Sequence, residues 1–106
     1  MAKYLYHASY TAEGVRGLLK DGGSSRREAI RKMTESLGGT MEALYFAFGE
    51  DDVYLIVDVP DHVTAAAASL AVAASGAVNI KTTVLLTPEE IDAAAKKTVA
   101  YRPPGR

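Results

Sequence analysis

Four short stretches of the chain have the mixture of apolar and aromatic residues that favours β-strands. The densest is Val53–Val59, whose β-branched and aromatic side chains suit a packed, pleated surface. Thr40–Phe48 precedes it, and the intervening Gly49–Asp52 has the glycine and aspartates of a turn, so a β-hairpin is predicted here. The other two stretches are Lys3–Tyr10 and Val78–Leu86. We therefore predict four strands.

Two longer helices are predicted between these strands. Ser25 and Glu28 are spaced as a capping box, which indicates that a helix begins there, and the glycine pair at 38–39 ends it. His62–Ser75 is predicted to form an alanine-rich helix with Asp61 as its N-cap. Since alanine forms helix well but buries little area, we expect this helix to lie close to its sheet and to tolerate enlargement poorly.

Two shorter helical segments complete the pattern. One or two turns are predicted after the first strand, from the spacing of Val15, Leu18 and Leu19. A last helix is predicted from Pro88 to about Lys97, because Thr87 and Glu90 have capping-box spacing and proline suits the first helical position. Residues 101–106 read as an extended tail, so we expect one domain over residues 1–100 followed by this tail.

The order of these elements is β-α-β-β-α-β plus a C-terminal helix, which is the split βαβ arrangement of a ferredoxin-like α+β fold. We expect an antiparallel sheet in the order 4-1-3-2, with the first strand beside the third and the two main helices over one face. A loop at Gly49–Asp52 would place Phe48 opposite Val53 and Leu44 opposite Val57.

The second face of the predicted hairpin is also largely apolar. It carries Met41, Tyr45, Tyr54 and Ile56, and the chain has no further main helix to cover them. We therefore expect a homodimer in which a second copy covers this face and closes an α/β barrel. A higher homo-oligomer built on the alanine-rich helix or the tail is the alternative.

The central stretch also resembles the GYD domain family, which is named for a Gly-x-Tyr-Asp turn. Gly49 and Asp52 stand at the glycine and aspartate positions, and Asp51 stands at the tyrosine position. The further similar segments are Asp58–Asp61, Gly76, Thr82-Thr83 and Thr87–Glu90. The resemblance runs from Tyr4 to Ala95. It implies a ferredoxin-like domain that pairs into a dimeric α/β barrel, and it assigns no catalytic role to any residue of this chain.

Composition narrows the classes of partner. The chain has 106 residues, 24% of them charged, and a net charge of −1, so it lacks the basic footprint of a nucleic-acid-binding protein. No apolar run is long enough for a membrane span. With no cysteine and two well-separated histidines, we expect neither a metal site nor a cofactor. The start of the chain lacks a signal-peptide pattern, so we expect a cytoplasmic protein.

His7 and Asp58 are the candidate catalytic pair. Both are predicted to lie within neighbouring strands, and they share a face if Leu5, His7 and Ser9 point into the barrel; the pattern leaves that orientation open. A carboxylate that orients an imidazole can make it an acid or base near neutral pH. The alternative is a structural polar pair at the dimer interface.

Tyrosines provide a candidate ligand pocket. Tyr6, Tyr45 and Tyr54 could surround a flat apolar ligand, with Ser9 and Lys81 on the adjoining strands as polar contacts. The alternatives are packing of the phenols in the core or the dimer interface, and a solvated lysine.

A third candidate is an anion site at the start of the second helical segment. Gly23, Ser24, Arg26 and Arg27 combine free amides, a helix N-terminus and two guanidinium groups. The alternative is a flexible linker between two helical pieces.

Three functions remain open. The first is an oligomeric α/β barrel that binds a small molecule. The second is a cofactor-independent enzyme, similar to an oxygenase or an isomerase, that uses His7 and Asp58 as acid and base. The third is a structural interaction module, and the fold alone does not choose among them.

Overall fold

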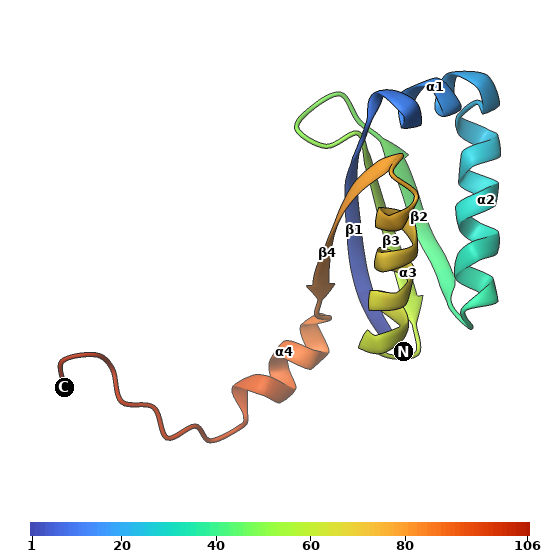
Figure 1. Cartoon of the computed structure of the whole chain (residues 1–106). Coiled ribbons are helices and arrows are strands. Elements are labelled where there is room, and N and C mark those ends of the chain that lie inside the picture. Colours follow the sequence, from blue (N-terminus) through green and yellow to red (C-terminus); the bar gives the residue numbers. More distant parts are fainter.

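The computed structural model describes all residues from 1 to 106 and has four strands and four helices (Figure 1). The strands are β1 (Ala2–Tyr10), β2 (Thr40–Phe46), β3 (Val53–Val59) and β4 (Val78–Leu85). The helices are α1 (Ala12–Asp21), α2 (Gly23–Ser36), α3 (His62–Ala74) and α4 (Pro88–Ala95). The α+β class predicted from the sequence is confirmed.

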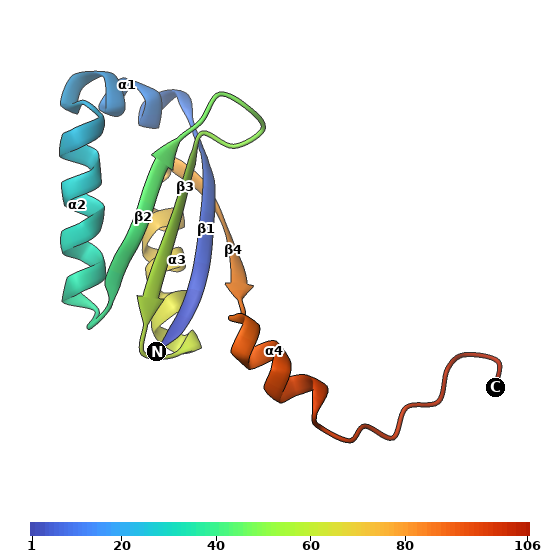
Figure 2. The ribbon, with the colours of Figure 1, turned by 180° about the vertical axis from the view of Figure 1, so that it is seen from behind.

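The strands form one antiparallel sheet in the order β2-β3-β1-β4. Counted from the β4 edge the order is β4-β1-β3-β2, so β1 lies beside β3 as expected. Helices α2 and α3 lie over one face of the sheet, and Figure 2 shows the opposite face without a helix over it. We call this second face the open face.

The core lies between the sheet and the two long helices. Tyr4, Tyr6 and Ala8 of β1 are buried on that side, so the alternate residues Leu5, His7 and Ser9 lie on the open face. The other buried members include Leu55, Val57 and Val59 of β3, Ile30 of α2, and Ala65 and Ala68 of α3. The two alanines bring α3 close to the sheet, in agreement with its composition.

The hairpin register differs from the one predicted. Phe46, not Phe48, lies opposite Val53, and Leu44 lies opposite Leu55, so the pairing is displaced by two residues. The reason is that the connection 47–52 is bound to β1: the Asp52 N–H donates to the Ala8 carbonyl at 2.8 Å. Because the displacement is even, Leu44 still faces the helices and Tyr45 still faces the open side.

A β-bulge reverses the faces at the start of β2. The register shifts between Met41 and Ala43, and Met41 lies opposite Val57 and packs against the core. The expectation that Met41 lies on the open face is therefore wrong. An inserted residue changes the side to which the following residues point, and hydrophobic alternation alone does not reveal it.

The start of α2 also differs from the sequence interpretation. This helix begins at Gly23, with Gly22 as N-cap and no side-chain cap bond, so Ser25 and Glu28 do not form the predicted capping box. Gly22 has φ +84°, which glycine adopts readily, and it allows a sharp corner between α1 and α2. Helix α1 is a full ten-residue helix capped by Thr11, longer than the one or two turns expected.

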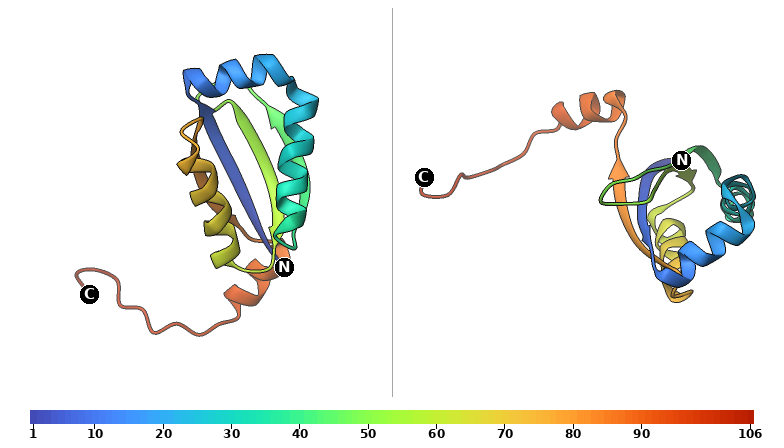
Figure 3. Two further views of the ribbon diagram at one scale, coloured as in Figure 1. Left: turned by 45° about the vertical axis from the view of Figure 1, so that its right-hand side comes forward. Right: turned by 90° about the horizontal axis from the view of Figure 1, so that it is seen from above.

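The C-terminal segment extends away from the rest of the molecule (Figures 1 and 3). The capping box of Thr87 and Glu90 is confirmed, with Pro88 at the start of α4. None of the helices has the length and apolar content needed to cross a membrane.

Candidate functional site

The open face is arranged in rows of side chains that cross the sheet. The strand register places Tyr45 beside Tyr54, Tyr54 beside His7, and His7 beside Lys81. The next row consists of Ala43, Ile56, Leu5 and Thr83, and beyond it lie Asp58, Lys3 and Leu85. An aromatic and polar row thus adjoins an apolar row at the centre of the face.

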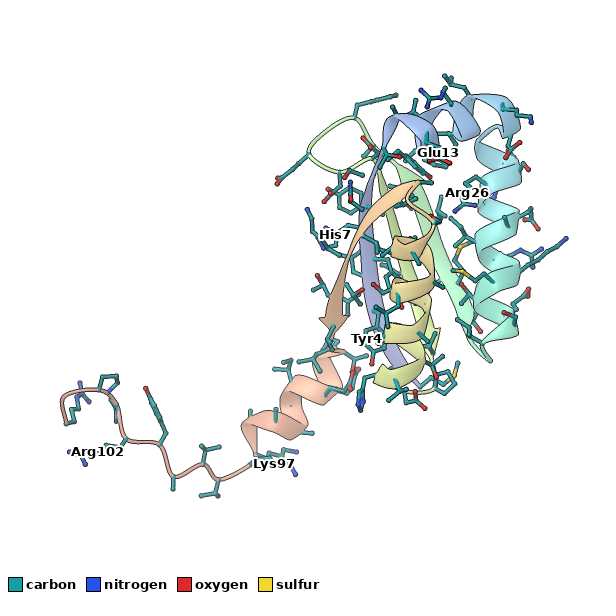
Figure 4. All side chains as sticks on the ribbon, viewed as in Figure 1. Tyr4, His7, Glu13, Arg26, Lys97 and Arg102 are labelled. Atoms are coloured by element: carbon teal, nitrogen blue, oxygen red, sulfur yellow. The ribbon has the colours of Figure 1, made fainter.

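His7, labelled in Figure 4, lies on the open face and has a polar partner at each of its two ring nitrogens. Its Nδ1 lies 2.9 Å from Asp51 Oδ2, and its Nε2 lies 3.2 Å from Thr83 Oγ1. Its ring is parallel to that of Tyr54 within 5°, with the centroids 6.1 Å apart. Since an ionised carboxylate only accepts hydrogen bonds, we assign the proton to Nδ1, which leaves neutral Nε2 to accept from the Thr83 hydroxyl.

Asp51 holds this arrangement together from the connection between β2 and β3. It is 5% exposed and also accepts a hydrogen bond from Lys81 Nζ at 3.2 Å. The hydrogen bond from His7, and then that from Lys81, lower the pKa of Asp51, while desolvation opposes the shift. Asp51 is therefore a carboxylate at neutral pH. We call Asp51, His7, Lys81 and Thr83 the Asp51 cluster.

The predicted pair of His7 and Asp58 does not form. Asp58 does share the open face, but the register places it opposite Lys3, four residues from His7 along β1. Lys3 Nζ binds Asp58 Oδ2 at 2.9 Å and Glu42 Oε2 at 2.8 Å. The hydrogen bonds to Glu42 and then Asp58 raise the pKa of Lys3. The sequence identified a histidine–carboxylate pair, and the structure assigns a different carboxylate to it.

The predicted tyrosine pocket is only partly assembled. Tyr45 and Tyr54 lie on the open face, with Ser9 and Lys81 on the same side. Tyr6 is instead buried beneath α3, where its hydroxyl donates to the Ala65 carbonyl at 2.6 Å. Burial raises the pKa of Tyr6. Its placement among the pocket residues is therefore wrong.

The four residues of the predicted anion site do not converge. Gly23, Ser24 and Arg27 line one hollow together with Phe46, whose ring lies 3.2 Å from the position a Cβ of Gly23 would occupy. Arg26 lines other hollows, including one that it shares with Glu13 of α1. An apolar ring over the helix start and two separated arginines do not form an anion cradle.

The helix side of the sheet has a small apolar cavity of about 40 Å³, lined by residues of α2, α3 and the sheet. A few water molecules would fill such a volume, so it is too small for a ligand. No group of three or more His, Cys, Asp or Glu side chains is placed to hold a metal ion. The open face is thus the surface on which polar side chains are organised.

Asp51 and Thr83 are the site residues that sequence reasoning missed. Asp51 stands where the family pattern has its tyrosine, and that departure was its only signal. Thr83 lies in the Thr-Thr pair of β4, but its contact with His7 depends on the pairing of β1 with β4.

Comparison with protein families supports the resemblance. The model of the GYD domain matches residues 4–95, which is most of the chain. No match was found among curated proteins or among solved structures.

Proposed function

We propose that this chain, which belongs to the GYD domain family, pairs with a second copy through the open face and binds a small molecule in the enclosed space. The apolar row supports the pairing, because Leu5, Ile56 and Ala43 are only half-buried and no helix lies over them. A sheet with one face exposed to water normally alternates apolar and polar residues more sharply.

The observation that carries the ligand proposal is the Asp51 cluster. A buried carboxylate orients an imidazole across a face that the chain itself does not cover. Lys81 keeps one ionic contact with Asp51 while its side chain is 55% exposed, which leaves further N–H donors for another group. The cluster therefore presents hydrogen-bonding groups toward the space that a second copy would enclose.

The row of aromatic rings indicates the class of ligand. Tyr45, Tyr54 and His7 follow one another across three strands, and the row ends at the ammonium group of Lys81. Rings of this kind favour flat molecules through offset stacking, and the ammonium favours an anionic substituent. We infer that the ligand is a flat, aromatic or conjugated organic anion.

The pairing is tested by sedimentation of the parent protein and of Ile56→Lys. We expect a lower subunit count for the variant than for the parent, because a charge at the centre of the open-face interface would be buried unpaired. Leu19→Lys places the same charge on an exposed position of α1 and should leave the subunit count unchanged. A parent protein that sediments as a monomer would refute the pairing.

Ligand binding is tested by calorimetric titration with 4-hydroxybenzoate, a flat aromatic anion. Lys81→Met should weaken binding about tenfold or more, since removal of a charged hydrogen bond costs at least about 1.5 kcal/mol. Lys32→Met, on the exposed side of α2, is the matched control and should bind as the parent does. Equal affinity of the two variants, or no binding by the parent, would contradict the proposed ligand class.

A second candidate function follows from the line of Asp51, His7 and Thr83. Asp51 can stabilise the imidazolium that forms when His7 Nε2 accepts a proton, and a substrate would replace the Thr83 hydroxyl at Nε2. This retains the enzyme hypothesis but replaces Asp58 by Asp51. Enol–keto conversion of phenylpyruvate, followed by ultraviolet absorbance, tests it.

In that assay His7→Ala should abolish turnover while phenylpyruvate still binds. Asp51→Asn should reduce turnover and retain binding, because Asp51 positions and stabilises the imidazole without touching the substrate. Thr83→Val should remain active, since its hydroxyl only occupies the substrate's place. Turnover that survives in His7→Ala would assign the reaction to another group.

A further inference from the structure

The outer side of α3 is apolar along its length. Ala65 and Ala68 face the sheet, and the opposite side carries Val63, Ala67, Leu70 and Ala74. Val63 is 67% exposed and Leu70 is 70% exposed. No charged residue occurs from Val63 to Ser75. A helix that is apolar on all sides is normally buried, so this outer side lacks its covering partner.

The C-terminal segment is exposed and lacks a surface of its own chain to pack against. Residues 86–106, which we call the arm, extend away from the body, and Figure 4 shows Lys97 and Arg102 far from the sheet. All residues of α4 are exposed, and this eight-residue helix makes no substantial packing contact with its own chain. Because so short a helix is marginal in water by itself, it needs a surface to pack against.

The junction between β4 and α4 is a well-defined helix start. Thr87 is extended, with φ −73° and ψ 159°, and the following proline disfavours the helical alternative. The Thr87 N–H donates to Glu90 Oε1 at 2.9 Å, and the Glu90 N–H donates to Thr87 Oγ1 at 3.1 Å. Two reciprocal hydrogen bonds and a proline thus fix the start of α4 directly after the strand.

We propose that the arm of one copy packs its apolar side on the outer side of α3 of a second copy. At helical spacing, Ile91, Ala94 and Ala95 of α4 share one side, and the charged Glu89, Glu90 and Asp92 lie on the others. The outer side of α3 offers no charge to pair with these carboxylates, so they remain in water. Alanines on both helices allow the two backbones to approach closely.

The dimensions of the two surfaces agree. Helix α3 has 13 residues and is therefore about 20 Å long, while α4 spans about 12 Å and the extended residues after it continue the arm. Val99 and Tyr101 of that continuation are 74% and 65% exposed. In a two-fold pair the contact occurs twice, so each contact needs only about half of the roughly 1,600 Å² of a standard interface.

This contact is separate from the pairing proposed above, because α3 lies on the opposite side of the sheet from the open face. Disruption of α3 or the arm should therefore leave the ligand site intact. We expect the open-face pair and the arm contact to join each chain to different copies, so the two contacts together predict an assembly larger than a dimer.

Sedimentation of full-length variants tests the proposal. Leu70→Asp and Ile91→Asp should each lower the subunit count to the same value, because they remove the two sides of one contact. Leu19→Asp, at an equally exposed leucine of α1, should keep the parental subunit count. Circular dichroism checks that each variant is folded. Unchanged subunit counts in both Leu70→Asp and Ile91→Asp would overturn the proposal.

Cross-linking identifies which surfaces meet, because the chain has no cysteine of its own. Leu70→Cys and Ile91→Cys proteins that differ in mass by a tag are mixed and treated with a short bis-maleimide reagent. A covalent product that contains one chain of each kind is expected. Products formed only between two Leu70→Cys chains would show α3 against α3, and the absence of any mixed product would show that the two surfaces do not meet; either result overturns the proposal.

Discussion

Because α1 packs closely against the start of β4, replacing glycine by alanine should have opposite effects on stability at two positions of α1. Gly14 and Gly17 lie three residues apart in α1, and each can be replaced by alanine. A Cβ at Gly14 would lie 2.1 Å from the carbonyl oxygen of Ala77, whereas a Cβ at Gly17 would have no atom within 4 Å. The two variants gain the same helix propensity and differ in this contact.

The size of each effect follows from these distances. Gly17→Ala should stabilise the protein by about 0.5–1 kcal/mol, since alanine is favoured over glycine within a helix. In Gly14→Ala the distance from the new Cβ to the Ala77 oxygen would be more than an ångström shorter than an ordinary contact of 3.4 Å. Helix α1 must therefore move away from Ala77. That movement strains the bond in which the Thr11 N–H donates to the Ala77 carbonyl at 3.0 Å.

Overpacking of this kind costs about 1–3 kcal/mol, and a lost hydrogen bond adds about 1 kcal/mol. After the gain in helix propensity, Gly14→Ala should be destabilised by about 1–3 kcal/mol. Urea unfolding followed by circular dichroism measures both variants, and each kcal/mol corresponds to about 4–8 °C in Tm for a domain of this size. A Gly14→Ala protein as stable as Gly17→Ala would refute the close approach of α1 to Ala77.

Three further changes test the core, the site and α3. Tyr6→Phe should lose about 1 kcal/mol of stability in urea unfolding, because it removes a buried hydroxyl that donates to α3, whereas Tyr101→Phe in the tail should change nothing measurable. The hydrogen bond from His7 lowers the pKa of Asp51, so the contribution of this carboxylate to stability is full above about pH 4 and is lost as the pH falls further. In unfolding curves measured from pH 3 to 7, Asp51→Asn should therefore reduce the loss of stability at the acidic end. Ala68→Leu should destabilise by about 1–3 kcal/mol through overpacking against the sheet, whereas Ala29→Leu on the exposed side of α2 should stay within about 0.5 kcal/mol, as measured by Tm.

Local pattern was sufficient for most of the fold. Strand β3 begins and ends where its apolar run does, and α3 and α4 begin at the caps that Asp61 and Thr87 provide. These features depend on residues close together in the chain, such as a proline that ends a ladder or a hydroxyl that accepts from an N–H three residues later. The antiparallel sheet then follows from the order of the elements.

Long-range pairing accounts for what the pattern missed. The orientation of Met41 depends on a bulge, and the partner of His7 depends on how β1 is placed between β3 and β4. The order of residues in the chain does not decide whether the histidine in β1 meets the carboxylate in β3 or the one in the preceding connection. Only the register shows that Asp58 pairs with Lys3 and that Asp51 is the partner of His7.

The two aspartates of the turn that precedes β3 have different partners. The Asp52 carboxylate accepts from the Tyr10 N–H at 2.8 Å and so fixes the connection to the end of β1. Asp51, at the family's tyrosine position, instead directs its side chain to His7 and Lys81.

The two neighbouring substitutions should therefore separate stability from binding. Asp52→Ala should cost about 1–3 kcal/mol in urea unfolding, since a backbone N–H loses a charged acceptor. Asp51→Tyr restores the family residue and keeps the Asp52 bond, so the turn should remain closed, but the imidazole and the ammonium lose their carboxylate. We expect altered affinity for 4-hydroxybenzoate in Asp51→Tyr and parental affinity per folded molecule in Asp52→Ala. Parental affinity in Asp51→Tyr and altered affinity in Asp52→Ala would contradict this assignment. That result would mean that Asp51 serves to close the turn and that the Asp51 cluster has no role in binding.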